Sequence, residues 1–159
     1  MHKIIFLLLT LALAFGCNEP SFKTIGSIQQ LDPSLAQITD TTAPVEIIAE
    51  GFNWTEGPLW VESEKMLLFS DIPPNKIFKW TETKGAELYL TPSGYTGATP
   101  RTGEPGSNGL LLNKEGKLVM CQHGDRRMAM MEAPLNAPKA AFISLAEQYQ
   151  GKKFNSPND

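Results

Sequence analysis

The stretch that decides the fold is residues 56–80, EGPLWVESEKMLLFSDIPPNKIFKW. It returns in altered form 52 positions later as residues 108–132, NGLLLNKEGKLVMCQHGDRRMAMME. Each copy has a short apolar segment, a polar turn, a second apolar segment, a loop and a third segment of alternating pattern. Short apolar or alternating runs bounded by turn residues are typical of β-strands. Residues 86–90 and 140–145 add an outer strand to each copy. The repeat therefore predicts an all-β fold made of two four-stranded units.

Four strands in about 50 residues are typical of a β-propeller blade, which buries its two faces only against neighbouring blades. The first predicted blade spans residues 52–90 and the second 106–145. A third opens at residue 155, where Asn158 follows Asn108 by 50 positions. Because a propeller closes with about 4–8 blades, this pattern predicts an incomplete propeller, a fragment of a longer protein. A sandwich of two sheets with eight strands is the alternative that strand spacing alone leaves open.

The composition is that of an ordinary foldable chain, with 159 residues, 42% hydrophobic residues and a net charge of −3. These values exclude a disordered charged tail and give no support for a nucleic-acid partner. The 13 glycines and 12 prolines disfavour long helices. Two cysteines in unrelated contexts, Cys17 and Cys121, exclude a disulfide scaffold or a cysteine-based zinc site. Cys121 takes the apolar place of Phe69 in the repeat, so we expect it to be buried and inert.

Residues 1–16, MHKIIFLLLTLALAFG, have the form of a cleaved export signal, with one lysine before an uncharged apolar run. The run is shorter than the roughly 20 apolar residues of a membrane-spanning helix. The ending AFGC at residues 14–17 resembles the lipobox of bacterial lipoproteins, in which the cysteine carries the lipid. We therefore expect lipidation at Cys17, a flexible tether over residues 17–45 and the incomplete propeller over 46–159. The expected location is the bacterial cell envelope, lipid-anchored or periplasmic, with the lipid as the only membrane contact.

The first strand of each unit carries the candidate metal site. In a propeller these strands begin near the central axis, so equivalent starting positions converge on one point. The residues at those positions are Glu56, Asn108 and Asn158. One carboxylate and two amide oxygens suit Ca²⁺ or a related oxygen-binding divalent cation. Taken singly, the first two residues are also ordinary turn residues and the third a chain end, and it is the repeat that favours the metal.

The loop after the second strand of the second unit, residues 121–127, carries the other candidate side chains. His123 faces Asp71 across the repeat, and a lone histidine is more often a structural hydrogen-bonding group than a catalyst. Arg126 and Arg127 could bind a carboxylate or polyol substrate, or could simply be solvated.

Five motifs together resemble the gluconolactonase family, which also includes regucalcin, the senescence marker protein. They are Glu56-Gly57-Pro58-x-Trp60, Phe69-Ser70-Asp71-Ile72-Pro73-x-Asn75-Lys76-Ile77, Ser107-Asn108-Gly109-Leu110, Cys121-x-His123-Gly124-x-Arg126-Arg127 and Gly151-Lys152-Lys153-Phe154-Asn155-Ser156-Pro157-Asn158-Asp159. The resemblance runs in order over residues 52–159. It implies a six-bladed β-propeller in which a divalent cation on the axis assists the hydrolysis of sugar lactones.

The resemblance also implies roles for single residues. Glu56 matches a family metal ligand, and Asn158 matches a position at the metal or in its substrate shell, so both are expected to bind the metal. His123 and Arg126 match positions near the mouth of the pocket, and we expect them, together with Asn108, to bind the substrate. The cation implied is Ca²⁺, with Zn²⁺ or Mg²⁺ as alternatives, and the substrate is a small-molecule lactone. The family's remaining ligands, an asparagine and the aspartate expected as base, come from later blades, so no catalytic residue is assigned. We expect a gluconolactonase-like carboxylic ester hydrolase, incomplete as given. The alternative is a non-enzymatic envelope propeller that binds a sugar or a protein.

Overall fold

The computed structural model describes residues 22–159, and the chain divides into two compact units between Ile47 and Ile48. The predicted export signal and the lipidation site, Cys17, lie outside the described residues. Within residues 22–159, no helix is long and apolar enough to cross a membrane.

The first unit contains few regular elements. The short strands β1 (Lys23–Thr24) and β2 (Glu46–Ile47) pair antiparallel. Between them lies one 3₁₀ helix, η1 (Pro33–Gln37), whose start is capped by the Asp32 carboxylate. That carboxylate accepts the backbone N–H of Ser34 at 2.8 Å. In the described part of this unit, residues 22–47, regular structure is thus limited to one short strand pair and one 3₁₀ helix.

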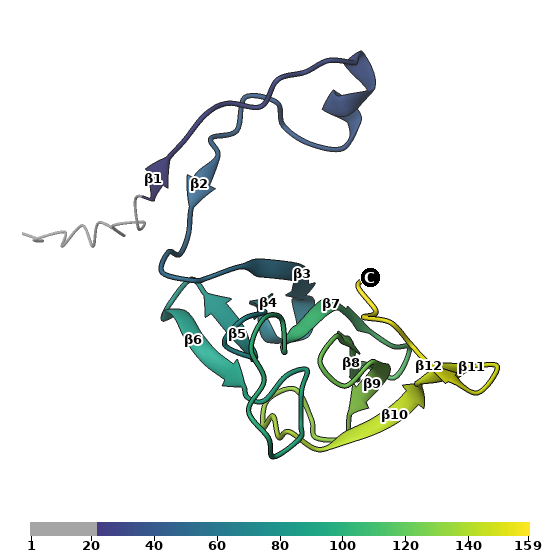
Figure 1. Cartoon of the computed structure of the whole chain (residues 1–159). Helices are drawn as coiled ribbons and strands as arrows, with labels where there is room; N and C mark the ends of the chain where they lie inside the picture. Colours follow the sequence, from purple (N-terminus) through teal and green to yellow (C-terminus); the bar gives the residue numbers. More distant parts are fainter. Residues whose placement is uncertain (1–21) are drawn as a thin grey trace, which may run out of the picture. The chain divides into compact units, whose positions relative to one another are not determined.

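The second unit is built on two four-stranded antiparallel sheets, each a simple meander in which chain neighbours pair (Figure 1). The first sheet contains β3 (Thr55–Val61), β4 (Met66–Asp71), β5 (Lys76–Thr81) and β6 (Gly85–Leu90). The second contains β7 (Ser107–Leu112), β8 (Leu118–Gln122), β9 (Arg127–Met131) and β10 (Phe142–Ala146). A short 3₁₀ turn, η2 (Glu62–Glu64), follows β3, and β11 (Gln148–Tyr149) pairs with β12 (Lys152–Lys153). The prediction of an all-β fold is confirmed.

Both sheets carry the same irregularity in their first strand. Glu56 pairs with Ser70 and Leu59 with Leu68, so three steps along β3 oppose two along β4. In the second sheet the bulge falls between the pairs that Ser107 and Leu110 make with β8. A bulge of this kind bends a strand and re-aims its side chains. The repeat therefore extends to the detailed path of the backbone.

The strand pairing corrects the gapless alignment of the two units at one point. The β3–β4 connection holds four residues, 62–65, whereas the β7–β8 connection holds five, 113–117. The additional residue belongs to a turn in which the Asn113 side chain accepts the backbone N–H groups of Glu115 and Lys117, at 3.1 and 2.8 Å. The position equivalent to Glu56 is consequently Ser107, and Asn108 is one residue further along.

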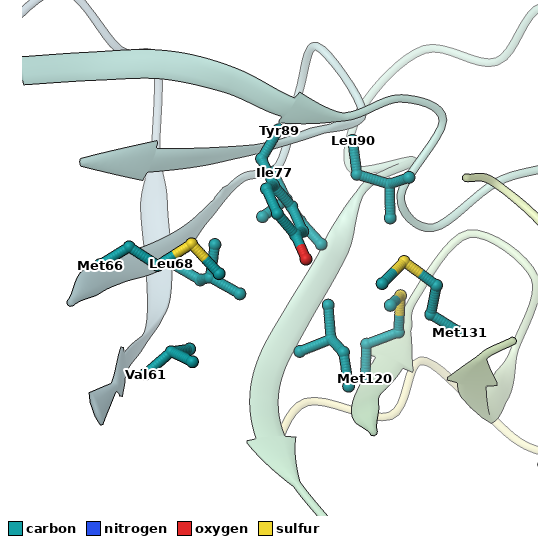
Figure 2. Close-up of a cluster of buried hydrophobic side chains, with 9 residues drawn as sticks. Val61, Met66, Leu68, Ile77, Tyr89, Leu90, Met120 and Met131 are labelled. Atoms are coloured by element: carbon teal, nitrogen blue, oxygen red, sulfur yellow. The ribbon is translucent and has the colours of Figure 1, made fainter. Parts of the chain in front are cut away.

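The hydrophobic core lies between the two sheets (Figure 2). It comprises Val61, Met66, Leu68, Ile77, Tyr89 and Leu90 from the first sheet and Leu118, Met120 and Met131 from the second. The alternation of the strands explains this selection, because every second side chain of β4 and β8 points to the same face. Each fully buried leucine, isoleucine or methionine contributes about 1.5–3 kcal/mol relative to an exposed one. The shared core thus holds the two meanders as one body.

Candidate functional site

Three chain segments meet beside the first strands of the two sheets. A Cβ atom at Gly57 would lie 2.4 Å from the carbonyl oxygen of Asn108, so only glycine permits this approach. On the other side, the backbone N–H of Gly109 donates to the carbonyl oxygen of Asn158 at 2.8 Å. The segments that carry the predicted residues Glu56, Asn108 and Asn158 therefore lie side by side, at a place that we call the junction.

Glu56 is half-buried, and its Oε1 accepts a hydrogen bond from the indole Nε1 of Trp54 at 3.2 Å. The backbone leading into β3 is held by Asp71, whose carboxylate accepts the N–H groups of Asn53 and Trp54 at 3.1 and 2.9 Å. Asp71 is only 3% exposed. Buried carboxylates of this kind are expensive to leave unpaired, so Asp71 fixes the start of the strand that presents Glu56.

Asn108 is almost fully buried, and both its backbone and its side chain make hydrogen bonds. Its carbonyl oxygen accepts from the Ser70 hydroxyl at 3.0 Å, and Ser70 also lies 2.8 Å from the Ser107 hydroxyl. Its side-chain Nδ2 lies 3.2 Å from Nδ1 of His123. Among residues 22–159, no hydrogen-bond donor pairs with its Oδ1. The amide oxygen is thus available to a ligand.

His123 has a second neighbour that the sequence did not reveal. Oε2 of Glu104 lies 3.7 Å from Nδ1 of His123, within ion-pair distance when the ring is protonated. Glu104 belongs to the long connection between β6 and β7, residues 91–106, which has no periodic pattern. No signal in the sequence marked Glu104, because its role depends on where a loop passes in space.

A buried polar network holds the connection that contains Glu104. Oδ1 of Asn75 accepts the N–H groups of Ser93 and Gly94, at 3.0 and 2.7 Å. The Ser93 hydroxyl then accepts the N–H of Ser107 at 3.1 Å. The backbone carbonyl oxygen of Ser93 accepts a hydrogen bond from Nε2 of Gln122 at 3.0 Å. Because these polar groups are buried and paired, they fix the start of β7, where Asn108 lies.

The two arginines of the loop after β8 are not simply solvated. Nη1 of Arg126 donates to Oδ1 of Asn155 at 2.7 Å and to the Ser156 hydroxyl at 2.5 Å. Arg127 donates to Oε1 of Gln122 at 2.6 Å and pairs with Asp125 at 3.1 Å. Arg126 thus contacts the segment that carries Asn158. Its expected role in substrate binding remains a prediction.

The donor chemistry of the junction fits a hard divalent cation. Within residues 22–159, no three His, Cys, Asp or Glu side chains are placed to hold a metal ion. The oxygen donors that are present are the Glu56 carboxylate, the unpaired Oδ1 of Asn108 and the exposed side chain of Asn158. Ca²⁺ takes about 6–8 oxygen ligands, so these residues would supply part of a coordination shell.

Cys121 lies apart from this chemistry. The residue is buried in β8, with 3% of its surface exposed. Burial, with a smaller contribution from the nearby negative charge of Asp159, raises the pKa of the thiol. The thiolate is therefore scarce at neutral pH, which agrees with the expectation of a buried, inert side chain.

Comparisons with known proteins agree with the resemblance found in the sequence. Residues 54–159 match the model of the SMP-30/Gluconolactonase/LRE-like region. A gluconolactonase of Zymomonas mobilis is 38% identical over 144 residues, which cover 89% of this chain and 39% of the relative.

Two solved structures share the fold. One, a structural-genomics protein provisionally described as a gluconolactonase, is 31% identical with a TM-score of 0.63, over 81% of this chain and 39% of its own. The other, a gluconolactonase of Xanthomonas campestris, is 24% identical with a TM-score of 0.64, over 88% of this chain and 43% of its own. This chain spans about two fifths of the length of these relatives. By its sequence motifs and by the family match over residues 54–159, the chain belongs to the SMP-30/gluconolactonase/LRE-like family.

Proposed function

We propose that this chain is part of a metal-dependent hydrolase that opens sugar lactones. The observation that supports the proposal is the junction, where the three segments that carry Glu56, Asn108 and Asn158 lie side by side. The donors there are oxygen atoms, and in a member of the gluconolactonase family such a set suits a cation that assists lactone hydrolysis.

The cation of this proposal is Ca²⁺, with Zn²⁺ or Mg²⁺ as alternatives, held by Glu56 and Asn158. When bound, such an ion supplies Lewis-acid polarisation of a carbonyl group. The protein's own contribution is positional: Trp54 orients the Glu56 carboxylate through its indole N–H, and Asp71 holds the backbone that carries both residues.

Substrate binding is proposed for Asn108 and His123. The Oδ1 of Asn108 is free of hydrogen bonds among the described residues and can accept from a sugar hydroxyl. His123 stands beside it and is partly exposed, so its ring can reach a bound lactone. We assign no general base within residues 22–159.

The two meanders are proposed to be neighbouring blades of a six-bladed propeller. The outer faces of both sheets support this proposal, because they are apolar where the outer faces of a sandwich are polar. A pocket of about 280 Å³ beside the first sheet is lined mainly by apolar side chains, including Phe52, Leu67 and Phe69. One of about 400 Å³ beside the second is lined by Leu111, Val119 and other apolar residues. Such faces suit further blades on both sides.

Substitution of Glu56 tests the metal and the hydrolase together. In the full-length protein, Glu56→Gln keeps the side-chain shape and removes the negative charge. Loss of a direct ligand should weaken Ca²⁺ binding by more than the roughly 10–100-fold caused by changes around a ligand. Calorimetry with Ca²⁺ and a pH-stat assay with δ-gluconolactone measure the two effects.

The matched control is Glu62→Gln, in the exposed turn after β3. It should leave Ca²⁺ affinity and lactone hydrolysis unchanged. Full activity in the Glu56→Gln protein would end the assignment, and a wild-type protein that binds sugars without hydrolysing lactones would favour a binding propeller.

We also propose that the protein is carried to the bacterial cell envelope and anchored by a lipid on Cys17. The support is the export signal and the lipobox-like ending at residues 14–17. In a bacterial host, a palmitate analogue should label the wild-type protein and not Cys17→Ala. Persistent labelling of that variant would contradict the proposal.

A further inference from the structure

The segment that carries Asn158 has little structure of its own. After β12 the chain continues through residues 154–159 without a helix or strand. Its backbone is held at both ends, where Phe154 donates to Glu147 at 3.0 Å and Gly109 donates to Asn158 at 2.8 Å. A segment tied only at its ends needs a further contact to fix the side chains between them.

Arg126 makes that contact. In the part of the chain that the structure describes, it is the only side chain outside the segment that hydrogen-bonds to it. Its Nη1 donates to Oδ1 of Asn155 and to the hydroxyl of Ser156. Hydrogen bonds from a charged donor are about twice as strong as neutral ones. The guanidinium thus bridges the loop after β8 and the Asn158 segment.

The backbone at both ends of this bridge is unusual. Arg126 has φ +62° and Ser156 has φ +56°, although neither is a glycine. The left-handed region is uncommon for such residues, and it persists where the surroundings require it. Here the two left-handed residues are joined by the hydrogen bond between Nη1 and Oγ. A glycine at either position would fit this backbone but would lose the hydrogen bond.

We propose that Arg126 is a positioning residue, which clamps residues 155–156 and so holds Asn158 at the junction, and does not bind the lactone directly. The part of this inference that concerns the metal rests on the proposed function. The clamp itself does not, because it concerns only how one segment of the chain is held.

Hydrogen exchange at the Gly109 amide tests the clamp without metal or substrate. That amide is bonded to the Asn158 carbonyl, so its protection reports whether the segment is docked. In the full-length protein, Arg126→Gly should raise its exchange rate about tenfold or more. The variant suits the left-handed backbone, so general destabilisation does not explain the result. Unchanged exchange would overturn the clamp.

Lys65→Gly is the matched control, since it also replaces a cationic residue in the left-handed region, with φ +49°. Lys65 lies in the turn between β3 and β4 and contacts Glu62. It should leave Gly109 exchange unchanged. Ser156→Gly added to Arg126→Gly should change the exchange rate little beyond Arg126→Gly alone, because the loss of Arg126 has already removed its contact with Ser156. Additive effects would count against the clamp.

Calcium affinity and the kinetic constants then distinguish a positioning role of Arg126 from direct binding of the lactone. As a positioning residue, its loss should lower Ca²⁺ affinity about tenfold or more, with KM for the lactone near normal at saturating Ca²⁺. A raised KM with normal Ca²⁺ affinity would assign Arg126 to substrate binding and overturn the proposal. If the wild-type protein binds no Ca²⁺, the proposed function fails, while exchange at Gly109 still decides the clamp.

Discussion

The two four-stranded sheets follow the same backbone path, but residues at equivalent positions have different roles. Asp71, at the end of β4, is buried and accepts backbone N–H groups that lead into its own sheet. His123 occupies the corresponding place just after β8, but it is partly exposed and faces Asn108 and Glu104. One position thus serves structure in the first sheet and lies at the candidate site in the second. A repeated strand path can keep its bulges while the loop residues take on separate tasks.

The largest effect is expected at Gly57, where the first strands of the two sheets lie in close contact. In Gly57→Ala, a Cβ would lie 2.4 Å from the Asn108 carbonyl oxygen, at φ +56°. The clash and the left-handed backbone together should lower the free energy of unfolding by about 3 kcal/mol or more. Denaturant unfolding measures it. In the second sheet, Gly116→Ala has φ +73° but open space, so it should cost only about 1 kcal/mol. Equal costs would show that contact between the sheets is not the cause.

Removing the buried carboxylate of the first sheet should cause the next largest loss in the free energy of unfolding. Asp71→Ala leaves the N–H groups of Asn53 and Trp54 without their acceptor, so we expect a loss of about 2–3 kcal/mol. His123→Ala, at the equivalent position, should cost less than about 1 kcal/mol because the ring is not fully buried. Thermal or urea unfolding compares the two variants. A larger loss for the histidine variant would reverse the assignment of roles.

A smaller effect concerns a contact that only the outer strand of the first sheet makes. The Tyr89 hydroxyl donates to the carbonyl oxygen of Leu135 at 2.8 Å, beyond β9 of the other sheet. Tyr89→Phe should lower stability by about 1 kcal/mol, whereas Tyr149→Phe, at a 72% exposed position, should have no measurable effect. An unchanged unfolding midpoint in Tyr89→Phe would show that the apolar packing alone joins the sheets here.

The smallest effect tests a chemical difference at one repeat position. Cys121 stands in β8 where β4 has Phe69, and burial raises the pKa of its thiol above the ordinary range. A raised pKa means less thiolate at pH 7–8, so iodoacetamide should react far more slowly with the native than with the denatured protein. Mass spectrometry after timed labelling checks this. Rapid labelling of Cys121 in the native state would show that the outer face of β8 opens readily.

Strand positions could be predicted closely because alternation and apolar runs are local properties. The outer strands expected at 86–90 and 140–145 are observed at Gly85–Leu90 and Phe142–Ala146. The register of the first strands could not be predicted from the sequence. One additional residue in the turn at 113–117 shifts the register but leaves the apolar pattern of the strands unaltered. The alignment therefore paired Glu56 with Asn108, whereas the strand pairing makes Ser107 the equivalent of Glu56.

The sequence by itself determined the all-β class, the two repeated units and the oxygen donors at their first strands, because period, turn residues and donor chemistry are properties of the chain. Only the tertiary structure decided the partners: Glu104 beside His123, Asp71 beneath Trp54 and Arg126 on residues 155–156. These contacts join residues that are 17–30 positions apart. No local pattern encodes them, since they exist only once the packing of the two sheets has set the paths of the loops.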